Sequence, residues 1–217
     1  MSVVKKMLMR RTLYTLCLFF VVLLQVGART PMRQWLTSMP DSVMPLLTKN
    51  NRLDFIDFFD ARMEAVVTNL MDGKSRMDTL SDDYVRISYT QSCEVAMKLL
   101  PVNDSTDVLC MVTTAKAAID DSRIAFFDEQ WNPLPTVSYI SEPCMDDFRS
   151  IEQSNLEWSK LNVFFRTYHL SANSTELQCV LTATGYLSEE DRVAVAPYVR
   201  QEPITYGWIN NRYQRYE

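Results

Sequence analysis

Residues 51–70, with the sequence NRLDFIDFFDARMEAVVTNL, form the densest apolar run beyond the N-terminal segment and most constrain the fold. Their apolar side chains recur every three or four positions, which is the spacing of one helical face laid on a core. The predicted buried face consists of Ile56, Phe59, Met63, Val66 and Leu70, with Phe55 and Val67 beside it. The predicted solvent face carries Asp54, Asp57, Ala61 and Glu64. The pattern therefore predicts a helix that covers the strands following it.

Capping residues define the start of this helix, whereas its end has two interpretations. Asn51 is a favourable N-cap, and Asp54 places a carboxylate near the free N–H groups of the first turn. The run AVVT at 65–68 favours a strand. The helix therefore ends either near Arg62, followed by an extended segment, or near Leu70.

The first 28 residues have the features of a secretory signal peptide. Four basic side chains precede the apolar stretch LYTLCLFFVVLL at 13–24, which is short for a membrane span. Small residues then occupy the positions that a signal peptidase reads, so we predict cleavage after Ala28. An uncleaved membrane anchor is the alternative. Cleavage would leave an exported, soluble chain, residues 29–217, with no integral membrane span.

The charge beyond residue 28 argues against nucleic acid as a partner. The sequence has 22 basic and 27 acidic residues, and four of the basic ones lie in the predicted signal peptide. The remaining 217 − 28 = 189 residues therefore carry a net charge of 18 − 27 = −9. Such a surface repels nucleic-acid phosphates and anionic lipid head groups. A chain of this length can bury a sizeable core as one domain or as two small ones.

Cysteine usage leaves the disulfide state open. Cys17 lies within the predicted signal peptide, and four cysteines remain beyond it: Cys93, Cys110, Cys144 and Cys179. An even number in an exported chain permits disulfides, with three connectivities. The spacings match no zinc-binding pattern. We expect most of these cysteines to be buried apolar thiols.

Between residues 83 and 134 the apolar period changes to two, which is typical of β-strands. In residues 93–99 apolar side chains alternate with Glu94, Ala96 and Lys98, which predicts a half-buried strand. A turn at 103–105 would set Cys110 opposite Leu99. The connections are too short for parallel crossovers, so the segment is predicted to be an antiparallel meander. Its strands are predicted at 84–89, 93–99, 108–114 and 124–127, with an extension around 131–134.

The flanking segments give fewer signals. Residues 29–40 are expected to be a lead-in, followed by a short helix that begins at Asp41-Ser42 and ends at Leu47. A helix is predicted at 147–161, and Ser188 is predicted to cap another short helix. Two further hairpins are predicted, one pairing 162–168 with 176–182 and one closing the chain at 204–216, where Asn210-Asn211 suits a turn with positive φ angles.

These elements place the chain in the α+β class, with antiparallel β-meander sheets covered by helices. A proline-containing loop at 135–146 marks a boundary between residues 29–140 and residues 141–217. Each part contains a helix followed by strands, so the chain forms either two helix-plus-sheet halves or one continuous domain. Two facing layers and one larger sheet both fit the pattern.

Several segments resemble a known protein family. The runs PLLTKNNRLDFIDFFDA, TNLMDGKS, LSDDYVRIS, MKLLP and DSRIAFFDEQWNPLP are similar to a family of exported Bacteroidales proteins classed as a domain of unknown function. The resemblance covers residues 36–217 and implies a location in the periplasm or at the outer surface of a Gram-negative bacterium. It brings no catalytic residues and no cofactor. More loosely, the element order resembles small periplasmic folds of the PepSY and β-lactamase-inhibitor-protein types.

The candidate chemical groups favour structural roles. The carboxylates of the 51–70 helix lie on a straight solvent face rather than converging as calcium ligands. His169 is the only histidine, and no G-x-S-x-G, H-E-x-x-H or Walker-type motif accompanies it. Asp82-Asp83 and Asp146-Asp147 each precede a predicted element, where a cap or turn is expected. We therefore predict no catalytic residues, no metal ligands and no cofactor.

Aromatic residues gather on the closing hairpin and suggest an interaction surface. Tyr206 and Trp208 would share one face, and a turn at Asn210-Asn211 would set Tyr213 opposite Trp208. Such clusters occur in cores and in interfaces, and an edge hairpin accepts partners. The predicted interaction surface consists of Tyr206, Trp208, Tyr213 and Tyr216.

Three functions remain open. The main prediction is a non-catalytic binding module for a protein or glycan of the cell envelope. The first alternative is an envelope hydrolase, which requires a deep pocket with two or more carboxylates of raised pKa. The second is an inhibitor of an envelope enzyme, which requires a concave sheet face lined with exposed aromatic side chains.

Overall fold

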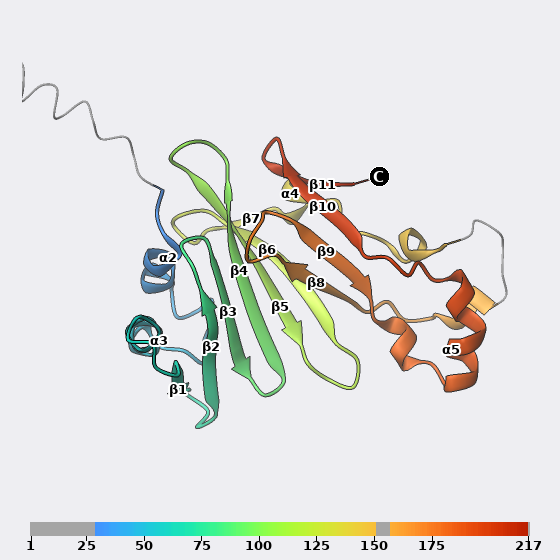
Figure 1. Cartoon of the computed structure of the whole chain (residues 1–217), viewed down its shortest axis with the longest axis horizontal. Helices are drawn as coiled ribbons and strands as arrows, with labels where there is room; N and C mark the ends of the chain where they lie inside the picture. Colours follow the sequence, from blue (N-terminus) through green and yellow to red (C-terminus); the bar gives the residue numbers. More distant parts are fainter. Residues whose placement is uncertain (1–28, 151–156, 217) are drawn as a thin grey trace, which may run out of the picture.

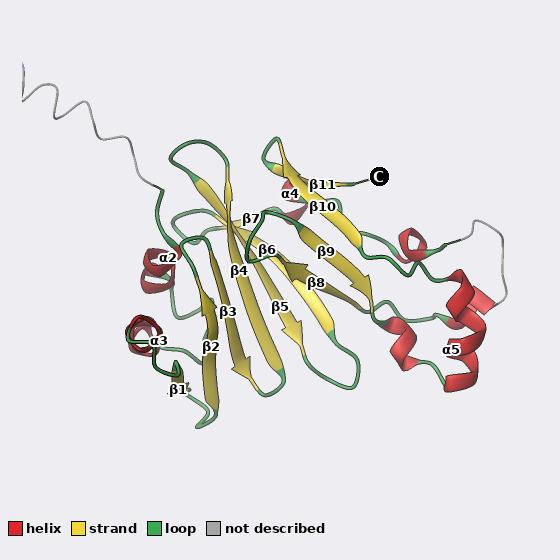
Figure 2. Ribbon diagram, viewed as in Figure 1, coloured by secondary structure: helices red, strands yellow, loops and turns green. Residues whose placement is uncertain are grey.

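The computed structural model describes residues 29–150 and 157–216 (Figure 1). The predicted signal peptide, residues 1–28, lies outside this part of the chain. The described residues form two antiparallel sheets with short helices, which confirms the predicted α+β class and the antiparallel meander (Figure 2). No helix in these ranges is both long and apolar enough to cross a membrane.

The first sheet has seven strands, and each pairs with its neighbours in sequence. The period-two pattern predicted the strands from Tyr84 onward but not the polar strand that begins at Lys74. Both edge strands are short, which leaves little open edge for pairing with other chains. The strands are β1 (Val66–Thr68), β2 (Lys74–Leu80), β3 (Tyr84–Thr90), β4 (Cys93–Pro101), β5 (Asp107–Ala115), β6 (Asp121–Phe127) and β7 (Pro133–Leu134).

Two helices cover one face of this sheet. Helix α2 (Met32–Ser38) occupies the segment expected to be a lead-in, and helix α3 (Lys49–Asp60) is the first part of the predicted amphipathic helix. Figure 1 shows them side by side, next to β2 and β3. They bury Trp35, Leu36 and Phe55 against the sheet. The sheet side of this core comprises Val85, Ile87, Val95, Met97, Leu99, Leu109 and Met111.

The second sheet packs on the opposite face and has the order β11-β10-β9-β8. Figure 1 shows its orange and red strands crossing the green and yellow strands of the first sheet. Its strands are β8 (Arg166–Leu170), β9 (Leu177–Leu181), β10 (Ile204–Ile209) and β11 (Arg212–Arg215). Short helical segments connect and flank them: α4 (Thr136–Tyr139), η1 (Met145–Phe148), η2 (Glu157–Lys160), η3 (Ala183–Tyr186), α5 (Glu189–Val195) and η4 (Ala196–Tyr198).

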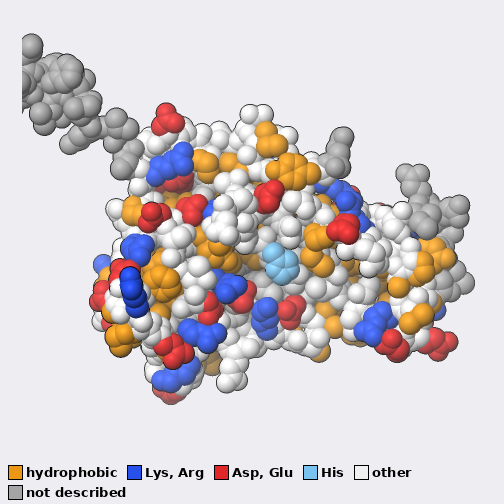
Figure 3. Space-filling model, in the orientation of Figure 1, with side chains coloured by type: hydrophobic (Ala, Val, Ile, Leu, Met, Phe, Trp, Pro, Cys, Tyr) orange, Lys and Arg blue, Asp and Glu red, His pale blue; other side chains and the backbone are white. Residues whose placement is uncertain are grey.

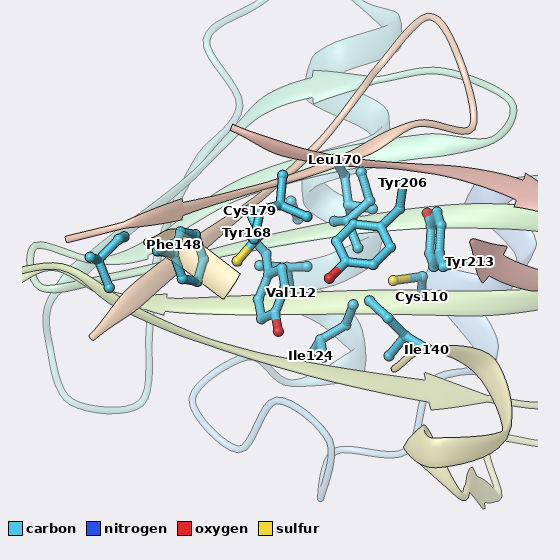
Figure 4. Close-up of a cluster of buried hydrophobic side chains, with 14 of the residues drawn as sticks. Cys110, Val112, Ile124, Ile140, Phe148, Tyr168, Leu170, Cys179, Tyr206 and Tyr213 are labelled. Atoms are coloured by element: carbon cyan, nitrogen blue, oxygen red, sulfur yellow. The ribbon is translucent and has the colours of Figure 1, made fainter. Parts of the chain in front are cut away.

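The sheets enclose a core to which both contribute (Figure 4). Along β5, Cys110 and Val112 face the second sheet, whereas Leu109 and Met111 face the helices. The central strands are therefore buried on both faces, which the nearly continuous apolar run VLCMV reflects. The first sheet lies within residues 29–140 and the second within residues 141–217. A division of the chain into two units at residue 140 stays a prediction.

The prediction of a half-buried strand at 93–99 is wrong, because the second sheet covers its polar face. Ala96 and Lys98 are buried there, and Lys98 is only 1% exposed. The Lys98 ammonium is compensated by an ion pair with Asp83 (Nζ–Oδ2 2.8 Å) and donates a hydrogen bond to the carbonyl of Ala172 (3.1 Å). Ala172 lies in the β8–β9 turn, so this lysine ties the second sheet to the first.

Helix α3 begins earlier and ends earlier than its apolar pattern suggests. Thr48, not Asn51, is the N-cap: its hydroxyl accepts a hydrogen bond from the Asn51 backbone N–H, and Asn51 Oδ1 accepts one from the Thr48 N–H. The helix ends at Asp60, so of the two predicted ends the one near Arg62 is correct, and β1 follows as the extended segment. Two residues of the predicted helical face lie beyond this end and are exposed, Met63 (60%) and Leu70 (65%).

The predicted short helix at 41–47 does not form, because Arg52 of α3 organises this segment in another way. The Arg52 side chain is 1% exposed and donates to three backbone carbonyls, those of Leu36 (Nε, 2.9 Å), Met39 (Nη2) and Leu47 (Nη1, 2.6 Å). It also forms an ion pair with Asp41 at 2.9 Å. The segment therefore wraps around a buried guanidinium as a series of turns.

Two predictions for the second half are corrected. In the predicted helix at 147–161, the described residues form 3₁₀ segments at 145–148 and 157–160, and residues 151–156 lie outside the described part. The predicted strand at 162–168 starts only at Arg166. The helix predicted after Ser188 is confirmed, with the Ser188 hydroxyl accepting a hydrogen bond from the Asp191 N–H at 3.1 Å.

All four cysteines within the described residues are free thiols. Cys110 and Cys179 are fully buried in the core between the sheets, Cys93 is half-buried and Cys144 is exposed. Cys110 pairs with Lys98 across the β4–β5 hairpin rather than with Leu99, which corrects the predicted register by one residue. This shift places Cys110 and Leu99 on opposite faces of the sheet.

Candidate binding groove beside the C-terminal hairpin

The C-terminal hairpin forms as its turn residues predict. Asn210 and Asn211 have φ angles of 52° and 61°, the left-handed conformation that a two-residue hairpin turn requires. Trp208 pairs with Tyr213 across the hairpin, as the sequence register predicts.

The predicted interaction residues of this hairpin differ in accessibility. Tyr206 and Tyr213 are each 2% exposed and belong to the core between the sheets (Figure 4). Trp208 is half-buried, and its Nε1 donates to the carbonyl of Pro101 at 2.7 Å. Tyr216 is 47% exposed. An interaction surface at these four residues stays a prediction, with Trp208 and Tyr216 as its accessible members.

Tyr216 lies against the backbone of β10 at Gly207. A Cβ at Gly207 would stand 2.3 Å from the Tyr216 Oη and 2.6 Å from its Cζ. The absence of a side chain at Gly207 therefore creates the space that the Tyr216 ring occupies. This contact covers a position where a glycine would otherwise weaken the strand.

A groove of about 460 Å³ runs along the free edge of this hairpin. One wall is the segment after α4 and contributes Ser141, Glu142, Pro143 and Asp147. The other wall is the hairpin and contributes Tyr206, Arg212, Tyr213, Gln214 and Arg215. The volume is within the usual range of small-molecule sites.

The groove exists because the segment after α4 begins to pair with β11 at one residue and then separates from it. Ile140 forms a single parallel bridge with Tyr213. Pro143 follows, and it lacks the N–H that would continue the ladder. The chain then enters η1, whose first residue is Met145. The segment therefore leaves the strand edge, and a gap opens between it and Gln214.

Two arginine side chains bridge the walls. Arg215 contacts Asp147 through an ion pair (Nη1–Oδ1 2.7 Å) and a hydrogen bond to its backbone carbonyl (3.4 Å). Arg212 Nη2 donates to the Ser141 hydroxyl at 2.7 Å. These contacts hold the two walls at a fixed separation, so the groove is preformed.

Glu142 of the groove wall also forms a hydrogen-bond network with Arg166 and Tyr168. Arg166 forms an ion pair with Glu142, and its Nε donates to the Tyr168 Oη at 2.9 Å. The Tyr168 hydroxyl donates in turn to Glu142 Oε2 at 3.1 Å. Burial raises the pKa of Tyr168 well above its usual value, so this phenol stays protonated and remains a donor.

Asp147 is held in its ionised form. Burial raises the pKa of the Asp147 carboxyl, but hydrogen bonds from the Cys144 backbone N–H and from Arg215 outweigh burial and lower the pKa overall. The Cys144 N–H to Asp147 Oδ2 distance is 2.8 Å. At neutral pH this carboxylate therefore carries a negative charge and is not a proton donor.

The other sequence-derived candidates lie outside the groove. Asp54 and Asp57 are exposed on α3, and Asp60 is paired with Arg33 at 2.6 Å. His169 is exposed on β8, with its Nε2 3.1 Å from the Thr167 hydroxyl. Across residues 29–150 and 157–216, no three His, Cys, Asp or Glu side chains are grouped as metal ligands. On the face seen in Figure 3, acidic and basic side chains lie interspersed.

Although His169 is exposed, partial desolvation by neighbouring residues lowers the pKa of its imidazole, and the nearby Lys116 lowers it further, against smaller opposing effects of Glu94 and Asp120. The imidazole is therefore neutral at physiological pH. Its observed hydrogen bond joins it to a neighbour on the same strand, which fits a surface histidine.

Comparison with known proteins places the chain among uncharacterised relatives. The family model described as "Protein of unknown function (DUF3256)" matches residues 23–213. A solved structure, described as a domain of an uncharacterized protein from Porphyromonas gingivalis W83, is similar with a TM-score of 0.76 and 27% sequence identity. The alignment covers 87% of this chain and 98% of that one. No protein with a curated description matches. The resemblance to a Bacteroidales family of unknown function is thereby confirmed.

Proposed function

We propose that this chain, which belongs to the family of proteins of unknown function DUF3256, is a non-catalytic binding module whose ligand occupies the groove beside the C-terminal hairpin. The observation that carries this proposal is that Arg212 and Arg215 each connect the two walls of the groove, through Ser141 and Asp147 respectively. A preformed site of about 460 Å³ loses little conformational entropy when a ligand enters. Tyr206 and Tyr213, two of the four predicted interaction residues, are among the residues that line the groove.

Two observations favour binding over the alternatives. At this groove a carboxylate hydrolase would need an acid of raised pKa, whereas the pKa of Asp147 is lowered and Glu142 is engaged with Arg166. An inhibitor of the expected type needs an open concave sheet face. Both faces of the seven-stranded sheet are covered, one by α2 and α3 and the other by the second sheet.

We further propose that the protein is exported and acts in the periplasm or at the outer surface. The support for this lies in the sequence of residues 1–28, with its basic start, short apolar core and small residues before Arg29. Mass spectrometry of the protein purified from its host tests the proposal. A chain that starts at Arg29 is expected, and an intact N-terminus in the cytoplasmic fraction would contradict it.

The binding role is tested by NMR on ¹⁵N-labelled residues 29–217. Amide shifts are followed while acetylated tripeptides and neutral and acidic trisaccharides are added one at a time. We expect at least one compound to shift amides on both groove walls, around Ser141 and Gln214. Gln214→Trp should fill the groove and abolish the shifts, whereas Gln178→Trp, at an exposed position on β9, should leave them. Shifts confined to other surfaces would refute the groove as the site.

A further inference from the structure

We infer that the ligand of this groove carries one carboxylate, which binds the Arg212 guanidinium and the Ser141 hydroxyl. This inference rests on the proposed function and adds the chemical class of the ligand. It follows from the hydrogen-bonding capacity of Arg212, from the charge of the groove and from the geometry of the Arg212–Ser141 pair.

Arg212 differs in its partners from Arg215, the other arginine that lines the groove, and from the nearby Arg166. Arg215 is engaged with both a carboxylate oxygen and a backbone carbonyl of Asp147, and Arg166 with Glu142 and Tyr168. In the described part of the chain, no carboxylate lies within ion-pair distance of Arg212, whose side chain contacts the Ser141 hydroxyl. A guanidinium has five N–H donors, so Arg212 retains donors for an acidic group.

The charges around the groove leave one positive charge uncompensated. Among the residues that line the groove, Arg212 and Arg215 are positive and Glu142 and Asp147 are negative. Both carboxylates are already paired, Asp147 with Arg215 and Glu142 with Arg166 outside the lining, so Arg212 is the charge without a partner of opposite sign. This unpaired positive charge occurs in a chain whose overall charge is −5. A group with one negative charge would compensate Arg212, and its approach would be favoured over that of a cation.

The single unpaired positive charge of the groove favours a carboxylate over a phosphate monoester. A phosphate carries roughly 1.5 to 2 negative charges at neutral pH. One Arg212 charge cannot neutralise it, and the surplus would face the carboxylates of Glu142 and Asp147. A carboxylate has one charge and two coplanar oxygens that match the two N–H groups of a guanidinium edge.

Ser141 provides a second hydrogen-bond donor for such a carboxylate. Its oxygen accepts a hydrogen bond from Arg212, which leaves its own O–H free to donate to the same ligand. The Arg212 side chain is half-buried and already lies across the groove, so little ordering is needed when the ligand binds. Arg212 and Ser141 thus present two donors from opposite walls.

The test compares matched probes that differ only in the acidic group. Acetyl-Gly-Gly is titrated against its C-terminal amide, and the methyl glycoside of galacturonic acid, which has one carboxylate, against its methyl ester, by NMR on residues 29–217. Phenyl phosphate serves as the phosphate probe. The two pairs distinguish a peptide carboxylate from a sugar carboxylate as the source. We expect at least one acid to bind the groove about tenfold or more tightly than its neutral partner.

Two variants assign this preference to Arg212. Arg212→Gln should remove the difference between acid and neutral probe while leaving the fold intact by circular dichroism. Arg86→Gln removes the same charge from an exposed position on β3 and should preserve the difference. Equal effects of the two variants would show that net charge, not Arg212, governs binding, and would overturn the inference.

The remaining outcomes separate this inference from the proposed function. Acid and neutral probes that bind the groove equally would overturn the carboxylate requirement and leave the binding role standing. Tighter binding of phenyl phosphate would do the same. Shifts that fall outside the groove for every probe would overturn both. If no probe binds, the carboxylate inference is refuted, while the wider compound panel still decides the binding role.

Discussion

Arg52→Met is the substitution for which the structure makes the sharpest stability prediction. Arg52 is 1% exposed, and its guanidinium satisfies the carbonyls of Leu36, Met39 and Leu47. Methionine retains most of the apolar stem but provides no donor. The three carbonyls, one in α2 and two in the segment that joins α2 to α3, would then be left without this partner.

The expected loss is about 3–5 kcal/mol, because removing one member of a buried, charged hydrogen-bond network typically costs that much. Each hydrogen bond from a charged donor contributes roughly 1.5–3 kcal/mol, and the three are not additive because they share one side chain. The ion pair with Asp41 adds little, since Asp41 is 62% exposed. Against a typical total stability of about 5–15 kcal/mol, the loss is large.

Urea unfolding of residues 29–217, followed by circular dichroism, measures this loss. With a slope of about 2–3 kcal/mol per molar urea for a chain of this size, the midpoint should fall by roughly 1–2.5 M. Arg86→Met is the matched control, because Arg86 is exposed on β3 and its replacement should change stability by no more than about 0.5 kcal/mol. If the midpoint of Arg52→Met equals that of the control, the role assigned to Arg52 is wrong.

Three further predictions concern the hairpin, the groove and the shared core. Gly207→Ala should displace the Tyr216 ring and lower stability by about 1 kcal/mol, or about 2–4 °C in Tm. Adding Tyr216→Ala to this variant should lower stability no further. If thermal unfolding shows that the losses of the two single variants add up in the double variant, the contact is contradicted. Asp147 has a lowered folded-state pKa, so its contribution to stability is present above the ordinary value of 3.8 and is lost as the pH falls through the folded value. The stability difference between the parent and Asp147→Asn in urea unfolding should accordingly shrink below pH 3.8; a difference that persists in strong acid would contradict the assignment. Residues 29–140 alone would expose the sheet face that the second sheet covers, and should show no cooperative thermal transition; a sharp transition would establish two independent units.

The parts of the fold that local sequence determines were predictable. The meander from Tyr84 to Phe127 follows from its period of two, and the closing hairpin follows from Asn210-Asn211. Strand β2 gave no such signal because one of its inward positions is polar. Ser75 is fully buried, and its hydroxyl donates to the carbonyl of Tyr89 at 2.6 Å. A buried serine satisfied by a distant partner cannot be recognised from periodicity.

Burial on both faces of β4 was missed for a related reason. Alternation of polar and apolar residues predicts one solvent face, yet Lys98 lies on the face that the second sheet covers. Its partners, Asp83 and Ala172, are 15 and 74 positions away, and sequence alone does not bring them together. The sequence left the end of α3 open between Arg62 and Leu70 because apolar spacing continues past Asp60, where the chain in fact turns toward β1.

The groove itself was not predictable from the sequence. It depends on one bridge between Ile140 and Tyr213, which are far apart in the chain. The sequence pattern correctly placed Trp208 opposite Tyr213, but alternation does not decide which side of a hairpin faces the core. Tyr206 and Tyr213 therefore turned out to be buried, and the polar groups beside them form the site.

The central claim is that the groove beside the C-terminal hairpin is where this protein binds its ligand. The most direct test incorporates a compact diazirine residue, similar in size to leucine so that the groove stays open, at Gln214 and, as a control, at Gln178, and irradiates each protein in an envelope extract of its host. The account predicts one discrete adduct from position 214, suppressed by excess unlabelled protein and by Arg212→Gln, and none from position 178. The same adducts from both positions, or an adduct from position 178 alone, would contradict it.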